Sequence, residues 1–351
     1  MYMKMTFRWY GADDPVTLEQ IRQIPGMTGV VSAIYDVPVG EVWEYDKIQK
    51  LVDEVKNAGL ELKVIESVPM HEDIKLGTGD RDKYIEAYCK TLENLSRAGI
   101  EVVCYNFMPV FDWTRSSLDH VLPDGSTALI YEQSVIEKAD PSSEDLSLPG
   151  WDSSYTRGEL MSLLEQYKNI TEEDLWANLE YFLKQVIKTA EEVKVKMAIH
   201  PDDPPWSVFG LPRIITGKAN IKRFLSLYDS VYNGLTLCSG SLGANPQNDI
   251  EELVREFGNR IHFAHMRNIK LISDKSFEES AHYSPCGSLD MVKILKAYYN
   301  SGFDGYMRPD HGRMIWGENG RAGYGLYDRA LGSQYLIGIW ETLEKTGGKQ
   351  Q

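Results

Sequence analysis

Four residues that bind metals well in proteins end four short apolar stretches in the second half of the chain. His200 ends VKMAIH, Cys238 ends GLTLC, His265 ends IHFAH, and Asp310 follows GYMRP. Their separations of 38, 27 and 45 residues match no local ligand motif such as CxxC or HExxH. Taken singly, each has a structural interpretation, such as a small buried thiol or a hydrogen-bonded core histidine. The coincidence of all four favours a metal site, provided that the fold brings these stretches together.

The ligand types narrow the choice of metal without fixing it. Imidazole and thiolate together favour Zn or Fe(II), and a mixed set with an open position also admits Mn(II). Four protein ligands that close a tetrahedron would make a structural site. A larger coordination number with room for substrate would make a catalytic one.

Further polar residues gather at the ends of the same kind of stretch. They are Arg8, Trp9, Asn106, Arg267, Asn268 and Arg308. Arginine matches a carboxylate with two parallel hydrogen bonds, so three arginines on one face would form a receptor for a small anion. A surface ion pair is the alternative for any one of them. We predict that these six residues bind substrate.

His311 directly follows the candidate ligand Asp310. It should therefore lie near the metal without binding it, a position that suits a general acid or base. The glycine-rich stretch 316–327, WGENGRAGYGLY, has little helical or strand pattern. We expect this stretch to be mobile and to carry Tyr324 into the site.

The elements that must position these residues alternate along the chain. Strand patterns occupy residues 4–10, 29–34, 60–66, 100–107, 195–200, 234–240, 260–266 and 304–310. Helical patterns occupy residues 46–58, 81–98, 171–193, 218–229, 248–257, 289–300 and 327–345, with Gly59 and Gly99 at helix ends and a capping box at Thr171 and Asp174. Eight βα units close most simply as an α/β (β/α)₈ TIM barrel. A doubly wound sheet is the main alternative, but no glycine-rich phosphate loop follows the first strand.

A barrel of this kind needs about 250 residues, so a chain of 351 residues has a surplus. Much of it falls in residues 108–170, where an ordinary βα loop would have 2–6 residues. We therefore predict a single domain over residues 1–351, with 108–170 as a lid or wall on the active-site face. A surface ornament or an oligomer contact is the alternative.

The chain carries a formal net charge of −15, which repels nucleic acid and anionic membranes. An anionic substrate must then be recognised by local arginines or a metal. Neither a signal-peptide pattern nor a membrane-spanning stretch is evident, so we expect a cytoplasmic protein. The four cysteines have no disulfide-framework spacing, and we expect them to be reduced.

Several long strings resemble the D-mannonate dehydratases of hexuronate breakdown. They are MTFRWYG (5–11), HPDDPPWSVFGLPRI (200–214), CSGSLGANP (238–246), HFAHMRNIK (262–270) and MRPDHGRMIW (307–316). The resemblance covers the whole chain. It implies a TIM barrel of the xylose-isomerase-like type, a divalent metal, Mn(II) or Fe(II), at His200, Cys238, His265 and Asp310, and a homo-oligomer, with a dimer favoured.

The reaction that the resemblance implies converts D-mannonate to 2-keto-3-deoxy-D-gluconate with loss of water. The C2 proton is weakly acidic, because its removal places a second negative charge beside the carboxylate. A divalent cation and an arginine can stabilise the enediolate. One group removes the proton, and another protonates the departing C3 hydroxyl. Our hypothesis is that His311 and Tyr324 divide these roles, in an order that the sequence leaves open.

Three other functions compete with this prediction. A metal-dependent sugar isomerase or epimerase on the same barrel would act on neutral substrates, which the three arginines disfavour. A metal-dependent phosphodiesterase would need a basic groove. A non-catalytic sugar-acid-binding protein would not need a reactive histidine beside the metal.

Overall fold

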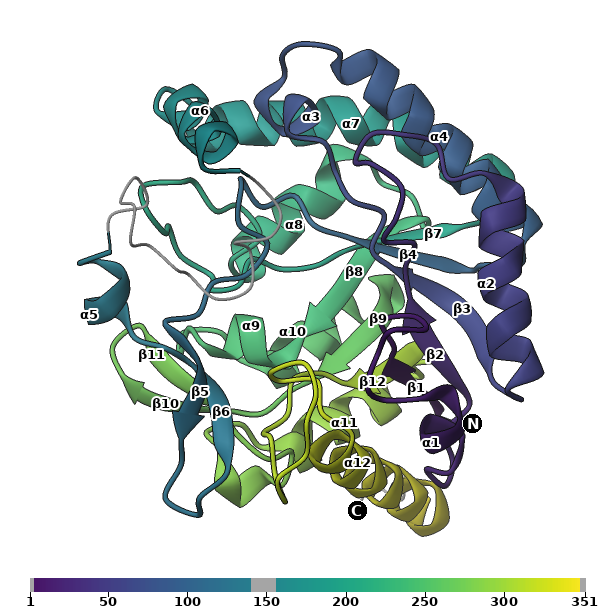
Figure 1. The fold of residues 1–351 in the computed structure, drawn as a ribbon, viewed down its shortest axis with the longest axis vertical. Helices are drawn as coiled ribbons and strands as arrows, with labels where there is room; N and C mark the ends of the chain where they lie inside the picture. The colour runs from purple at the N-terminus through teal and green to yellow at the C-terminus, as the bar shows by residue number, and fades with distance from the viewer. Residues whose placement is uncertain (1–2, 140–155, 348–351) are drawn as a thin grey trace.

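Eight of the apolar stretches form the parallel strands of a closed barrel. The computed structural model describes residues 3–139 and 156–347. The barrel strands are β1 (Lys4–Arg8), β2 (Gly29–Ser32), β3 (Glu61–Glu66), β4 (Val102–Tyr105), β7 (Lys196–Ile199), β8 (Asn233–Cys238), β9 (Ile261–Met266) and β12 (Tyr306–Pro309). Their order around the barrel is β1-β12-β9-β8-β7-β4-β3-β2. The predicted (β/α)₈ barrel is confirmed (Figure 1).

Helices lie between consecutive strands, as the amphipathic patterns predict (Figure 1). The helices at the predicted positions are α2 (Tyr45–Asn57), α4 (Arg81–Arg97), α7 (Glu172–Val193), α8 (Lys218–Leu227), α10 (Ile250–Phe257), α11 (Met291–Asn300) and α12 (Tyr327–Thr346). The other described helices are α1 (Leu18–Arg22), α3 (Glu72–Leu76), α5 (Gln133–Ile136), α6 (Arg157–Tyr167) and α9 (Ser239–Gly243), with single 3₁₀ turns at Gly258–Arg260 and Ser284–Cys286.

The helix ends have the local chemistry that the sequence predicts. The Thr171 side chain accepts from Asp174 N at 3.2 Å, and Thr171 N donates back to Asp174 Oδ2 at 2.9 Å, which completes the capping box of α7. Gly59 and Gly99 follow α2 and α4 with φ of 78° and 81°, a left-handed conformation that glycine adopts without strain. The chain can therefore turn directly from these helices into β3 and β4.

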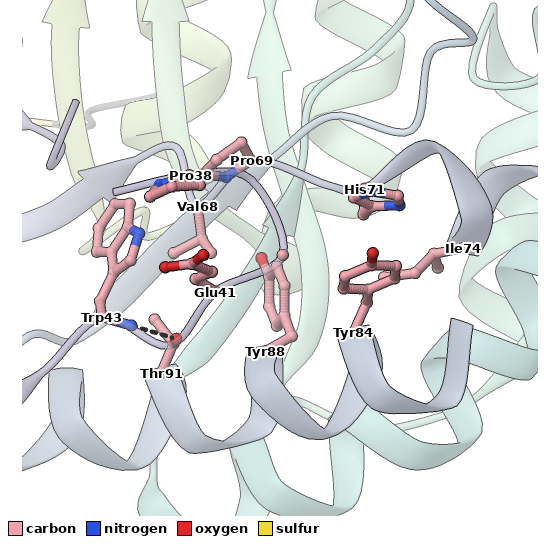
Figure 2. A pocket seen from close by; sticks show the side chains of 11 residues that line it. Pro38, Glu41, Trp43, Val68, Pro69, His71, Ile74, Tyr84, Tyr88 and Thr91 are labelled. Atoms are coloured by element: carbon pink, nitrogen blue, oxygen red, sulfur yellow. Dashed lines mark hydrogen bonds between the residues drawn. The ribbon is translucent and has the colours of Figure 1, made fainter. Parts of the chain in front are cut away.

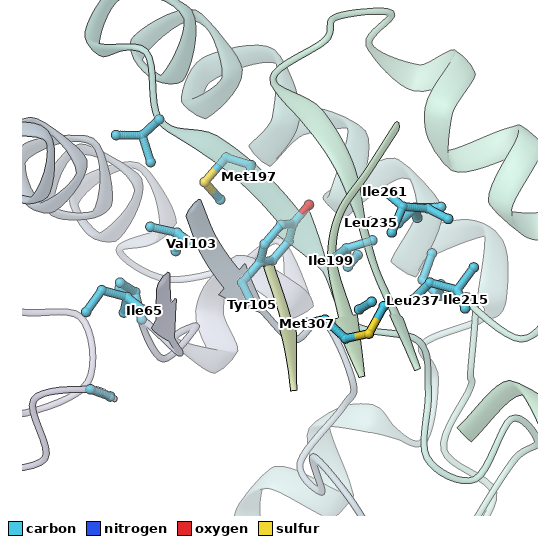
Figure 3. Packing of buried hydrophobic residues seen from close by; sticks show 14 of the residues in the cluster. Ile65, Val103, Tyr105, Met197, Ile199, Ile215, Leu235, Leu237, Ile261 and Met307 are labelled. Atoms are coloured by element: carbon cyan, nitrogen blue, oxygen red, sulfur yellow. The ribbon is translucent and has the colours of Figure 1, made fainter. Parts of the chain in front are cut away.

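The pleat of each strand separates the apolar core from the barrel interior. Val103, Leu235, Leu237 and Met307 belong to the large core that includes the helix residues (Figure 3). The residues between them in the strands point inward and form a smaller apolar cluster, which consists of Val31, Val64, Val102, Cys104, Ala198, Phe263 and Tyr306. Successive side chains of a strand point to opposite faces. Every second residue at a strand end therefore faces the barrel axis.

A four-stranded antiparallel sheet beside the barrel was not predicted from the sequence. Its order is β10 (Ile269–Ser273), β11 (Ser276–Glu279), β6 (Thr127–Tyr131) and β5 (Ser117–Val121). Strands β5 and β6 belong to the 108–170 insertion, whereas β10 and β11 form a hairpin directly after β9 (Figure 1). The two halves of the sheet meet where β6 pairs with β11, at Tyr131 and Phe277. This contact lies between distant segments, so no local pattern reveals it. Residues 140–155 of the predicted insertion lie outside the described residues.

Among the described residues, none of the helices combines the length and the apolar character that crossing a membrane requires.

We predict that His262 makes the stability of the barrel sensitive to mild acid. Burial, reinforced by the positive charges of Lys196 and Arg260, lowers the pKa of His262 to about 3 from 6.5. The folded state therefore favours the neutral ring. This contribution to stability is complete above pH 6.5 and is lost as the pH falls from 6.5 toward 3. At pH 5 the loss is on the order of 2 kcal/mol.

The measurement is urea unfolding of the wild type and of His262→Gln at pH 7 and pH 5. The loss of unfolding free energy between the two pH values should be smaller in His262→Gln than in the wild type. His120→Gln, in the partly exposed hairpin of the insertion, is the matched control. Equal pH dependence of wild type and His262→Gln would contradict the prediction.

Candidate metal centre and active site

The strand pleat brings the four predicted ligands together at one end of the barrel. Ligand atoms of His200, Cys238 and His265 all lie within 4.8 Å of one another. Asp310 Oδ2 lies 3.5 Å from Cys238 Sγ and 3.8 Å from His265 Nδ1. Cys238, His265 and Asp310 are buried. The sequence separations are large, but parallel strands of a barrel end at the same face.

His200 is oriented as a metal-binding histidine usually is, whereas His265 Nε2 contacts both Glu66 and Arg308 Nε, which donates to it at 3.2 Å. His200 Nδ1 lies 2.7 Å from the Pro201 carbonyl oxygen, and because a carbonyl only accepts, Nδ1 carries the hydrogen and Nε2 keeps its lone pair. His265 Nε2 lies 3.3 Å from a carboxylate oxygen of Glu66. A carbonyl or carboxylate on the second ring nitrogen is the common support of a metal-binding histidine. The donor set therefore fits a divalent metal.

Three polar groups surround the Cys238 sulfur. Ser241 donates to Cys238 Sγ from its hydroxyl at 3.2 Å and from its backbone N–H at 3.4 Å. The guanidinium of Arg267 lies 3.9 Å from the sulfur. The sulfur and the Asp310 carboxylate, 3.5 Å apart, are both negative when ionised. A cation between them would relieve their repulsion.

His311 and Tyr324 form a hydrogen-bonded pair beside Asp310. His311 Nε2 lies 2.8 Å from the Tyr324 hydroxyl and 3.8 Å from Asp310 Oδ1. On the other side of the ring, Nδ1 lies 3.2 Å from Glu279 Oε1. The order is carboxylate, imidazole and hydroxyl, in which the carboxylate fixes the imidazole tautomer. Burial, with Tyr10 and Asp310 nearby, raises the pKa of Tyr324 well above 10.

The loop that carries Tyr324 is held from both sides. Glu318 Oε2 accepts from the backbone N–H groups of Leu326 and Tyr327 at 2.7 and 3.2 Å. The fully buried Arg329 donates to the carbonyl oxygens of Arg8, Tyr324 and Gly325. The stretch contains no helix or strand before Tyr327, as expected, but it is tied to the end of β1. The predicted mobility of the loop stays a prediction.

Arg267 is enclosed by carboxylates. Its Nη1 lies 2.7 Å from Asp203 Oδ2, and its Nη2 lies 2.7 Å from Glu279 Oε1. Arg115, from the insertion, contacts both oxygens of Asp203 at 3.0 Å and Glu279 Oε1 at 3.0 Å. Burial would raise the pKa of Glu279, but Arg267, Arg115 and His311 lower it to about 2. Arg267 is thus part of an internal ionic network, and its predicted contact with substrate stays a prediction.

Arg308 is enclosed in the same manner. It contacts Glu66 Oε1 at 2.8 Å and Oε2 at 3.0 Å, and its Nη1 lies 2.8 Å from Asp310 Oδ1. Burial would raise the pKa of Glu66, but Arg308, His265 and Arg8 hold it well below its usual range. Arg308 thus orients Asp310 and Glu66.

A cavity of about 350 Å³ opens beside this cluster. Of the predicted site residues, Arg8, Asn106 and Tyr324 line it. Trp9 does not, because the pleat points it into the core between barrel and helices. Its neighbour Tyr10 lines the cavity instead.

Asn268 is also placed away from the cavity lining. Its amide donates to the carbonyls of Ala281 and Tyr283 at 3.1 and 3.3 Å and accepts from Leu289 N at 3.2 Å. The side chain is fully buried and holds the loop after β11. Its predicted role as a substrate contact stays a prediction, and its present contacts are with this loop.

Sequence reasoning missed several residues of the site. Glu66 ends β3, so the strand-end criterion that selected His200 and His265 could have found it. Asp203 lies in the quoted HPDDPP string. Arg115 and Glu279 lie in the small sheet, and Trp113, whose ring centroid is 5.8 Å from that of His311, lies in the insertion. Nothing local in the sequence distinguishes these last three.

The chain was compared with known proteins. The sequence model of the D-mannonate dehydratase family matches residues 3–350. Mannonate dehydratase 2 of Halalkalibacterium halodurans is 62% identical over 343 residues, which are 97% of this chain and 99% of that protein.

Solved structures agree with these matches. The crystal structure of mannonate dehydratase from Streptococcus suis serotype 2 has a TM-score of 0.92 and 52% identity, and the match covers 100% of this chain and 97% of that one. A xylose isomerase domain protein from Planctomyces limnophilus has a TM-score of 0.55 at 11% identity over 98% of this chain and 97% of that one. The second match shows the fold alone and confirms the xylose-isomerase-like type of barrel.

Proposed function

This chain belongs to the D-mannonate dehydratase family, and from that premise we propose how its residues carry out the reaction. The chain is a hydro-lyase that converts D-mannonate to 2-keto-3-deoxy-D-gluconate and water. The observation that carries our mechanism is the His311–Tyr324 pair, whose interacting atoms are 2.8 Å apart beside Asp310.

A divalent metal, Mn(II) or Fe(II), would be held by His200, Cys238, His265 and Asp310. When bound, it would draw electron density from the substrate carboxylate and its neighbouring hydroxyl, which makes the C2 proton easier to remove. The proposal is supported by the fixed tautomer of His200 and by the carboxylate on His265.

His311 and Tyr324 divide the two proton transfers. Glu279 accepts only, so the ring hydrogen of His311 lies on Nδ1, and Nε2 accepts from the Tyr324 hydroxyl. A proton can therefore pass between the two side chains along this bond. One of them takes the C2 proton, and the other donates to the C3 hydroxyl, which leaves as water. The resulting enol tautomerises to the 2-keto acid.

Arg8 is the arginine that we propose for the substrate carboxylate. It lines the cavity, and its donation to the Glu66 carbonyl oxygen fixes its direction. Asn106 lines the same cavity and can donate to a substrate hydroxyl. Arg267 and Arg308 act through the carboxylates that they hold.

We propose that the 108–170 insertion is a wall of the substrate site. Val110, Asp112 and Trp113 line the cavity from this segment. A surface ornament would not contribute to the cavity lining. The homo-oligomer and the cytoplasmic location stay predictions.

The isomerase alternative is not favoured. The epimerase and isomerase structures with the same fold share little sequence with this chain, whereas the family match covers residues 3–350. Arg8 also lines the cavity, where it can bind a substrate carboxylate. An isomerase that acts on neutral sugars would not need this arginine.

The reaction is tested directly by turnover. Protein purified without chelator is analysed by mass spectrometry for bound metal and incubated with D-mannonate or with its C2 epimer D-gluconate. We expect a 2-keto-3-deoxy acid from D-mannonate, since the proton-transfer pair is fixed relative to the ligand cluster. No product with any added divalent metal would refute the function.

Replacement of the acid–base pair should abolish most activity while metal remains bound. We expect kcat to fall about 10²- to 10⁴-fold in His311→Asn and in Tyr324→Phe. Tyr327→Phe, which removes an exposed phenol from the same loop, and His120→Asn are the matched controls. Wild-type kcat in His311→Asn with metal present would eliminate the histidine role.

Cys238→Ser should lose metal. Serine keeps the size of the side chain but does not ionise, so we expect the metal affinity to fall by about 10-fold or more. Metal content per chain after dialysis is the measurement. Cys286→Ser, at an exposed cysteine, is the control, and unchanged metal in Cys238→Ser would rule out the four-ligand site.

A further inference from the structure

A buried lysine lies in the wall of the substrate cavity, outside the catalytic cluster. Lys75 is 3% exposed and its partner Glu72 is 7% exposed. Both belong to α3, which follows β3, and both line the cavity that Arg8 and Tyr324 also line. A buried ammonium is costly unless hydrogen bonds satisfy its three hydrogens.

The described contacts of Lys75 account for two of those hydrogens. Nζ lies 2.6 Å from Glu72 Oε1 and 2.8 Å from the Met108 carbonyl oxygen. Glu72 is held in turn, because the Tyr167 hydroxyl donates to its Oε2 at 2.6 Å. Met108 and Tyr167 belong to the insertion. The Glu72–Lys75 pair thus connects α3 to the insertion. One hydrogen of the Lys75 ammonium is left for the cavity.

The helix that carries the pair is firmly anchored. The His71 ring stacks on Tyr84 of α4 with centroids 3.7 Å apart, and Ile74 lies beside Tyr84 (Figure 2). His71 Nδ1 also accepts from Asp73 N at 3.1 Å, and Asn178 of α7 donates to the Lys75 carbonyl at 2.8 Å. The gap beneath, shown in Figure 2, is about 10 Å³, room for roughly one water molecule.

A linear six-carbon acid must place its far hydroxyl groups in this cavity. With the carboxylate and the C2 and C3 hydroxyls at the ligand cluster, the C4–C6 hydroxyls extend along the remaining wall. The lining there combines the apolar side chains of Val39, Val68, Met70 and Val110 with the polar ones of Glu72, Lys75, Asn106 and Asp112. An apolar pocket discriminates poorly between hydroxylated substrates, whereas a buried donor rejects an analogue that leaves it unpaired.

We infer that Lys75, oriented by Glu72 and Tyr167, is a specificity-determining residue that donates to a distal hydroxyl of the substrate. This inference rests on the proposed function. It assigns the insertion a part in substrate choice, because Tyr167 and the Met108 carbonyl fix the position of the pair.

The test removes both charges together, so that neither is left buried and unpaired. The variant is Glu72→Gln/Lys75→Met, and the matched control is Lys90→Met/Glu93→Gln, an exposed pair with the same three-residue separation on α4. We measure kcat/KM for D-mannonate. We also measure the inhibition constant of the four-carbon aldonic acid that has the same configuration at C2 and C3 and lacks the C5 and C6 hydroxyls.

We expect kcat/KM for D-mannonate to fall about 10- to 100-fold in the variant. The inhibition constant of the four-carbon acid should stay within about two-fold, because that acid does not reach α3. The control should change neither value. Unchanged kcat/KM, or equal weakening of both ligands, overturns the inference, since equal weakening is the signature of a purely structural pair.

A second variant protects the test against misfolding. Tyr167→Phe keeps Glu72 and Lys75 in place and removes only the hydroxyl that orients Glu72. We expect a few-fold loss of kcat/KM for D-mannonate with the four-carbon inhibition constant unchanged, and no selective loss counts against the inference. Failure of the wild-type chain to dehydrate D-mannonate would instead refute the proposed function.

Discussion

The active-site face of this barrel depends on the local neutralisation of buried charge. Arg308 lies between Glu66 and Asp310, and Arg267 lies between Asp203 and Glu279. Removing one partner of such a pair leaves an uncompensated buried charge, which typically costs about 3–5 kcal/mol. Arg267 and Arg308 therefore contact carboxylates in the absence of substrate. They hold Asp310, Glu66 and Glu279 in place.

The pairing of arginines with carboxylates gives the small antiparallel sheet a part in the site. Glu279 ends β11, and Arg115 precedes β5 on the insertion, so the two come from the two halves of that sheet. The pairing of β6 with β11 brings them together. Because Glu279 also contacts His311, the orientation of the His311 imidazole depends on a sheet outside the barrel. The insertion thus supports the proton-transfer pair as well as lining the cavity.

The sequence predicted what local periodicity controls. The eight barrel strands, seven of the helices and the convergence of His200, Cys238, His265 and Asp310 follow from alternation and from strand ends. Pairings between distant segments could not be read in this way, and the small sheet with Glu279 was missed for that reason. Trp9 and Arg267 were chosen by residue type at strand ends. The pleat and the partner carboxylates, which residue type does not reveal, decide what those two side chains contact.

The balance of charges in the site explains how an acidic protein can recognise an acid. Glu66 is matched by Arg308, Glu72 by Lys75, and the Asp203–Glu279 pair by Arg115 and Arg267. Among the candidate ligands, two are anionic when they bind metal, the thiolate of Cys238 and the carboxylate of Asp310. A divalent cation held there would balance these two charges and would leave the ligand cluster neutral. Arg8 then remains as the cavity-lining cation without a carboxylate contact among the described residues. A chain of net charge −15 can therefore accept a monoanionic substrate, because the charge that opposes binding is distributed elsewhere and screened.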